Sequence, residues 1–302
     1  MLNDNIKSYL HLHLIVFIWG FTAILGELIS LDALPLVWFR MIMAVGFIVI
    51  YFLFKKQSLF ISKKLLLLFL FLGLVIALHW LTFFKAIKVS NVSVTLACLS
   101  TGAFFTSFLE PIFYKRRIVW YEVLFGLVVV FGLYIIFNFE GDYYLGIVLA
   151  LTSAFLSALF SVLNGKLAQK YDPTVISFYE LSGGVLCFSI YLLFTNSFSA
   201  EFFTLQPSDW MYLIILSSIC TAYAFIASVK VMKFLSPYTV MLTINLEPVY
   251  GIILALLIFK EKEQMSSGFY LGAVIIVVTV ILNGIVKYYL KRRAIAKKVN
   301  LG

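Results

Sequence analysis

Apolar residues fill this chain in ten long segments, and short polar stretches separate them. Each segment holds about 20 residues, the length of helix that crosses a hydrocarbon core ~30 Å thick. Lipid offers the backbone no hydrogen bonds, and the segments lack the alternation of barrel strands, so each is expected to be a helix. The predicted spans are Tyr9–Ser30, Leu34–Phe54, Leu65–Phe84, Ser90–Tyr114, Val119–Asn138, Tyr144–Gly165, Pro173–Thr195, Ser208–Ser228, Ser236–Phe259 and Ser267–Leu290. The pattern predicts an all-α polytopic membrane protein with ten transmembrane helices.

Composition agrees with this fold class. Of the 302 residues, 63% are hydrophobic and 12% are charged, and a soluble protein of this size has no room to bury so much apolar surface. The net charge of +9 does not indicate a nucleic-acid partner, because the basic residues are distributed by side. With the N-terminus in the cytoplasm, only Lys85, Lys88, Lys260 and Lys262 lie outside, while Arg40 lies within a span. The positive-inside rule therefore predicts that both termini are cytoplasmic.

The two halves of the chain resemble each other. Lys85–Lys88 (Lys-Ala-Ile-Lys) matches Lys230–Lys233 (Lys-Val-Met-Lys), and Gly126 matches Gly272 at nearly the same separation. Each Lys pair is followed by a short polar break and a long span. A near-constant separation indicates duplication of a five-helix unit.

The duplication predicts two repeats, residues 1–140 and 141–302. Five is an odd number, so the second repeat enters the membrane from the opposite side. Inverted repeats are a recurring design of secondary transporters, with the substrate site near the midplane between them. The step from repeat to transport is an analogy of architecture.

Ionisable groups inside a bilayer cost about 2.5–3.5 kcal/mol each on insertion scales, so each needs a reason to be there. Glu247 is the strongest candidate. Thr239, Thr243, Glu247 and Tyr250 are spaced as a polar stripe along one helix, and Pro248 is expected to kink it. Two interpretations of Glu247 stay open: a site for a substrate amine or a proton, and a carboxyl paired structurally with another helix.

His79 lies in the middle of a span beside Trp80. Imidazole titrates near neutral pH and can carry a proton or bind a carboxylate; the alternative is a packed histidine bonded to a backbone carbonyl. Trp80 and Trp19 both lie at mid-membrane, away from the interfaces that tryptophan prefers. They form either an aromatic wall for a ligand or ordinary packing.

Arg40 and Glu180 each lie ~10 Å deep, from the outer and the inner face respectively. Their different heights do not assure a direct ion pair. Arg40 is expected to attract anionic groups or hold an outer gate, and Glu180 to do the inner equivalent, with snorkelling to the interface as the alternative. Glu110 is expected to reach Lys115 or Arg116. It is not equivalent to Glu247, because their separation departs from that of the repeat.

No nucleotide-binding, metalloprotease or serine-hydrolase motif occurs in the sequence. No cofactor or metal is predicted, and transport driven by ATP on this chain alone is not supported. Gly268–Gly272 forms a GxxxG pattern, which predicts a dimer face and a possible homodimer.

The ordered set of features resembles the drug/metabolite transporter superfamily, in its EamA-like branch. The set comprises Trp19–Gly20, the Lys-rich joint at Lys85–Lys88, Leu246-Glu247-Pro248, and Phe259-Lys260-Glu261 at the end of the same span. The resemblance covers nearly the whole chain. It implies export of amino acids or related small metabolites across a bacterial inner membrane.

We therefore predict a secondary transporter, not an enzyme, that works by alternating access. Its partners would be a small-molecule substrate, the lipid bilayer and a coupling proton. The predicted pathway residues are Glu247, His79, Trp80, Arg40, Glu180, Trp19, Thr243 and Tyr250. Two alternatives stay open: an intramembrane enzyme that acts on lipid, using His79 with Glu247 or Glu180, and a scaffold or sensor without transport. The spread of ionisable residues in depth favours a pathway over one reaction centre.

Overall fold

The computed structural model describes residues 4–55, 59–139 and 141–299. The first half contains α1 (Asp4–Leu28), α2 (Ala33–Lys55), α3 (Lys63–Val89), α4 (Val92–Leu99), α5 (Gly102–Tyr114) and α6 (Trp120–Phe139). The second half contains η1 (Gly141–Tyr143), α7 (Tyr144–Leu167), α8 (Pro173–Phe194), η2 (Glu201–Phe203), α9 (Pro207–Ser217), η3 (Ser218–Tyr223), α10 (Ala224–Val231), α11 (Pro237–Ile244), α12 (Glu247–Phe259), η4 (Lys260–Glu263) and α13 (Ser267–Val299). Among the described residues, ten helical segments are long and apolar enough to cross a membrane. The predicted fold class is confirmed.

The fourth and ninth spans are each broken in the middle, at matching positions. Ser100–Thr101 separates α4 from α5, and Asn245–Leu246 separates α11 from α12. Adding 145 to the first and last residue numbers of α4 and α5 gives those of α11 and α12. Both pairs are also followed by a lysine with positive φ, Lys115 with 53° and Lys260 with 48°, although their ψ angles differ. The same irregular backbone, repeated in register, supports the duplication; residue 140, the proposed boundary of the halves, lies outside the described residues.

Pro248 lies at the break in span nine, where the sequence predicts a kink. It occupies the second position of α12, where the missing N–H has no intrahelical partner to lose. The break falls within the predicted polar stripe. Thr243 lies on α11 and donates to Thr239 O at 3.0 Å, while Glu247 begins α12.

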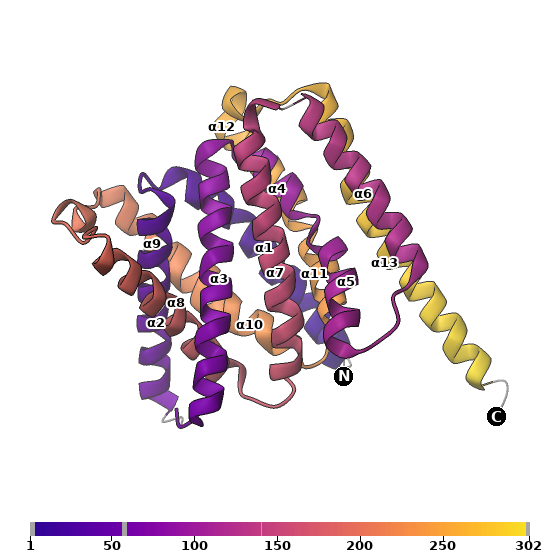
Figure 1. Ribbon diagram of the computed structural model, residues 1–302, viewed down its shortest axis with the longest axis horizontal. Helices are drawn as coiled ribbons and strands as arrows, with labels where there is room; N and C mark the ends of the chain where they lie inside the picture. The colour runs from indigo at the N-terminus through magenta and orange to yellow at the C-terminus, as the bar shows by residue number, and fades with distance from the viewer. Residues whose placement is uncertain (1–3, 56–58, 140, 300–302) are drawn as a thin grey trace.

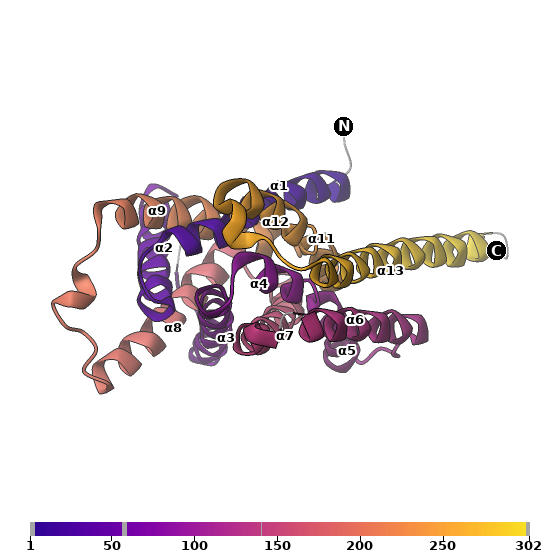
Figure 2. The ribbon, with the colours of Figure 1, turned by 90° about the horizontal axis from the view of Figure 1, so that it is seen from above.

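Both termini lie at the lower end of the molecule in Figure 1, as an even number of spans requires. We call this end the N-terminal side. Helix α3 packs against α7 and α8, and α1 packs against α12. Figures 1 and 2 show α6 and α13 side by side at one edge of the bundle.

The two glycines of the GxxxG pattern in α13 pack against α6 of the same chain. A Cβ on Gly272 would lie 2.7 Å from Gly132 O, and one on Gly268 would lie 2.2 Å from the Phe139 ring. Small residues let helices approach closely, and here they bring α13 onto α6. The pattern does not present a free dimer face, and a homodimer stays a prediction without it.

Helix α3 lies very close to α8 at Gly73, so a single methyl group added there should strongly affect stability. A Cβ on Gly73 would lie 2.1 Å from Glu180 O and 2.9 Å from Gly184 N, whereas one on Gly46 meets nothing within 4 Å. Gly73→Ala should lower the free energy of unfolding by about 1–3 kcal/mol or more through overpacking. Gly46→Ala should be neutral or stabilising, because alanine is the better helix former. Thermal unfolding in detergent measures both; equal midpoints would contradict the close approach.

Candidate functional site

A cavity of about 70 Å³ lies in the centre of the bundle, with side chains from both halves around it. A water molecule needs ~10–15 Å³ in this measure, so several water-sized groups fit. Five predicted pathway residues line it: Trp19, Arg40, His79, Trp80 and Glu247. The lining also includes Phe83, Phe160 and Phe225 as further aromatic side chains, and Ser157, Ser161 and Ser228 as small polar ones. With Leu99 of α4, the lining draws on residues from seven spans.

The guanidinium of Arg40 is held along one edge and over one face. Arg40 is 1% exposed, and its Nε donates to Thr221 Oγ1 at 2.6 Å. Its central carbon lies 3.9 Å from the centre of the Trp80 ring, a cation–π contact. Its Nη1 has no hydrogen-bond partner among the described residues. A buried N–H beside a cavity is suited to bind an anionic group, which arginine does with directional geometry.

Glu247 is the first residue of α12 and is 6% exposed. The start of a helix carries partial positive charge, which favours a carboxylate there. Within the described ranges, no ion pair or hydrogen bond joins Glu247 to Arg40. The cavity is therefore lined by one basic and one acidic group that do not neutralise each other by contact.

His79 is bonded to a backbone carbonyl, as one of the two interpretations expected, while its role in carrying a proton or binding a carboxylate stays a prediction. Its Nδ1 lies 2.9 Å from the backbone oxygen of Ser153, and Ser153 Oγ donates to His79 O at 3.0 Å. A carbonyl oxygen only accepts, so Nδ1 carries the hydrogen and the neutral ring keeps its lone pair at Nε2. The histidine is thus bonded to a backbone carbonyl and also lines the cavity.

Span eight unwinds into a π-helical turn, η3, beside the cavity. Thr221 Oγ1 donates to Leu216 O at 2.6 Å and accepts from Arg40, and Trp19 Nε1 donates to Cys220 O at 3.2 Å. Such turns free backbone groups and are frequent at functional sites. Sequence reasoning missed this element; the only signal was a polar threonine in the middle of an apolar span.

Three predicted pathway residues lie outside the cavity lining. Thr243 is bonded within α11, and Tyr250 packs edge-on against Phe17 of α1 with ring centres 5.5 Å apart. Glu180 is fully buried on α8, where it accepts a hydrogen bond from Asn164 Nδ2 at 3.0 Å. In the described part of the chain, Glu180 makes no ion pair with Arg40.

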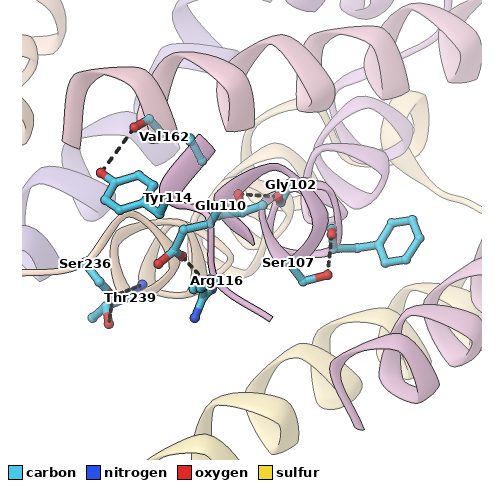
Figure 3. A network of polar contacts seen from close by, with 10 residues as sticks. Gly102, Ser107, Glu110, Tyr114, Arg116, Val162, Ser236 and Thr239 are labelled. Carbon is cyan, nitrogen blue, oxygen red and sulfur yellow. Dashed lines mark hydrogen bonds and ion pairs between the residues drawn. The ribbon is translucent and has the colours of Figure 1, made fainter. Parts of the chain in front are cut away.

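Glu110 belongs to a different polar cluster, at the N-terminal side (Figure 3). Its Oε2 lies 3.1 Å from Arg116 Nη2, which confirms the expected ion pair. Nearby, Tyr114 donates to Val162 O at 3.3 Å. Because Glu110 lies within α5 and Glu247 begins α12, the two glutamates are not equivalent in the repeat, as the sequence predicts.

On the side opposite the termini, polar contacts that sequence reasoning did not identify join neighbouring helices. Asp209 at the start of α9 accepts from Ser30 N at 2.8 Å and from Ser30 Oγ at 2.6 Å. Lys88 Nζ donates to Ile29 O at 2.6 Å. These contacts join the end of α1 to α9 and α3, and so hold this side of the bundle together.

Glu263 makes two further contacts on this side, and these predict an effect on stability. Its two carboxylate oxygens accept from Val92 N at 3.0 Å and Ser93 N at 2.9 Å, at the start of α4. Glu263→Gln replaces one acceptor by an NH₂ group, and should lower the free energy of unfolding by about 1–3 kcal/mol. The exposed neighbour Glu261 gives a matched control, Glu261→Gln, which should unfold like wild type. Equal thermal midpoints for both variants would contradict the capping role.

Comparison with known families matches both halves of the chain. The description of an EamA-like transporter family fits residues 6–138 and again residues 144–285. The chain belongs to the EamA-like transporter family. The two matches confirm the resemblance to the drug/metabolite transporter superfamily, and they identify a multi-pass membrane protein of a transporter family.

The fold of this EamA-like protein also occurs in a solved structure. That structure, described only as "Crystal structure of protein", superposes with a TM-score of 0.67 at 14% sequence identity. The likeness covers 91% of this chain and 96% of the other, so it extends over the whole architecture. A comparison with curated proteins gives no match.

Proposed function

We propose that this EamA-like transporter moves zwitterionic small molecules, amino acids or related metabolites, through its central cavity. One observation supports the proposal: Arg40 and Glu247 line the same cavity, and neither is fully paired. Among the described residues, Nη1 of Arg40 has no hydrogen-bond partner and the carboxyl of Glu247 has no ion-pair partner. An α-amino acid carries a carboxylate and an ammonium group on one carbon. It can satisfy both side chains at once, whereas a simple amine or acid satisfies one.

The rest of the lining favours an apolar side chain on the substrate. Trp19, Trp80, Phe83, Phe160 and Phe225 line the same cavity as Arg40 and Glu247. Aromatic faces contribute dispersion and remove apolar surface from water. Ligand sites of this kind are mostly apolar, with a few placed polar groups that fix orientation.

Alternating access requires that the cavity open to the side opposite the termini. The contacts of Asp209 with Ser30, and of Glu263 with the start of α4, are the bonds that must break on the side opposite the termini. The distribution of basic residues supports cytoplasmic termini, and the family resemblance implies a bacterial inner membrane. Export would then carry the substrate from the N-terminal side to the opposite side.

Counterflow in proteoliposomes tests this proposal. Vesicles loaded with an unlabelled amino acid should take up the labelled form in a saturable way, and vesicles without protein should not. A panel of apolar, polar and charged amino acids, with small organic acids, would define the preference. Correctly inserted protein that exchanges no zwitterion in the panel would contradict the proposed substrate class.

A further inference from the structure

Glu180 is a fully buried carboxyl that the proposed substrate site does not use. Asn164 Nδ2 holds one of its oxygens. Its Oε2 has no hydrogen-bond partner among the described residues, and the same holds for Asn164 Oδ1, Ser161 Oγ and Ser177 Oγ. Buried polar atoms in native proteins are satisfied by protein or by ordered water. These four atoms lie on α7 and α8, within one turn of the bond between Asn164 and Glu180.

The four residues lie at three successive heights along α7 and α8. Helices α7 and α8 run in opposite directions, and residues three apart differ in height by about 4.5 Å. With Asn164 bonded to Glu180, Ser161 lies one step toward the midplane, and it lines the central cavity. Ser177 lies one step the other way, toward the N-terminal end of α8 at Pro173. The polar residues thus extend from the cavity toward the N-terminal side as far as Ser177, which is fully buried.

The surroundings give the Glu180 carboxyl no cation. Helix α3 faces Glu180 with Gly73, which has no side chain; a Cβ built there would lie 2.1 Å from Glu180 O. Charged or titratable side chains on the helices packed around α8 are Arg40, Tyr51 and Lys55 on α2, Lys63, Lys64, His79, Lys85 and Lys88 on α3, Tyr144 and Lys166 on α7, and Lys230 on α10. No ion pair or hydrogen bond within the described ranges links any of them to Glu180. A buried carboxylate without a cation is costly, and a bound proton removes that cost.

We propose that Glu180 is a proton-binding site, which Asn164 and Ser161 connect to the central cavity. The carboxylate takes a proton from water in the cavity and becomes a neutral acid. It returns the proton to water when the cavity opens. Because Ser161 borders the substrate cavity, occupancy of the cavity and of the proton site are placed to influence each other. The coupling part of this inference rests on the proposed function.

The test uses Glu180→Gln in the full-length protein, with Glu261→Gln as the exposed matched control. Infrared difference spectra on a step in pH should show a protonated-carboxyl band in wild type and in the control, and that band should be lost in Glu180→Gln. In proteoliposomes, Glu180→Gln should keep counterflow without a gradient and lose accumulation driven by a pH gradient. Asn164→Ala retains the carboxyl but removes its partner, and should shift the same band if Glu180→Gln does not fold.

The outcomes separate the two proposals. A band that persists in Glu180→Gln, or that is unmoved in Asn164→Ala, overturns the proton site. Accumulation driven by pH that persists in Glu180→Gln overturns its role in coupling. Absence of counterflow in wild type refutes the proposed transport instead, and the infrared band then decides the proton site by itself.

Discussion

Replacing Glu247 with glutamine is expected to reduce counterflow of an apolar amino acid by about 10–100-fold. A hydrogen bond to a charged group contributes ~1.5–3 kcal/mol, and each 1.4 kcal/mol is a factor of ten. Glutamine keeps the size of the side chain but loses the charge that would meet the substrate ammonium. The carboxyl lines the cavity and has no ion-pair partner in the described residues, so the fold should tolerate the change. Initial rates of counterflow and thermal unfolding measure both effects.

Tyr250→Phe is the matched control for this variant. Tyr250 lies one turn further along α12, and packs against Phe17 rather than lining the cavity. It should transport like wild type. Unchanged counterflow in Glu247→Gln, with normal insertion, would remove Glu247 from the substrate site.

Arg40→Lys should lower the affinity for the same substrate by about tenfold or more, although the charge is retained. The planar guanidinium binds Thr221, stacks on Trp80 and keeps Nη1 free for a ligand, all at once. An ammonium is a compact point charge and does not reproduce the fork. Competition by unlabelled substrate in the counterflow assay gives the change in apparent affinity.

The control for Arg40→Lys is the reverse exchange at an exposed position, Lys63→Arg at the start of α3. It should leave the affinity unchanged. An Arg40→Lys variant with wild-type affinity would show that the guanidinium serves packing alone, through Trp80 and Thr221.

The spans could be predicted from the sequence, because their length follows from the thickness of the bilayer. The irregular elements inside them could not. Span four breaks at Ser100–Thr101 without a proline at the break, and span eight forms a π-helical turn around Thr221. Apolar composition is the same for a straight helix and a broken one, so only the packing of neighbouring helices distinguishes them.

The sequence predicted which residues line the candidate site better than it predicted the contacts that they make. Trp19, Arg40, His79, Trp80 and Glu247 meet at one cavity, because polar groups in a membrane turn away from lipid. The sequence does not give the rotation of each helix about its axis. The sequence therefore could not predict that Tyr250 faces α1, or that Glu180 bonds to Asn164 rather than to Arg40.

The proposed site binds both charged groups of a zwitterion in one cavity. The most direct measurement is the affinity of purified wild-type protein for three matched ligands: an aromatic α-amino acid, the amine that lacks its carboxylate, and the acid that lacks its ammonium. Loss of either contact should cost at least about 1.4 kcal/mol, so the amino acid is predicted to bind tenfold or more tightly than each analogue. An amine or acid that binds as tightly as the amino acid would contradict the claim.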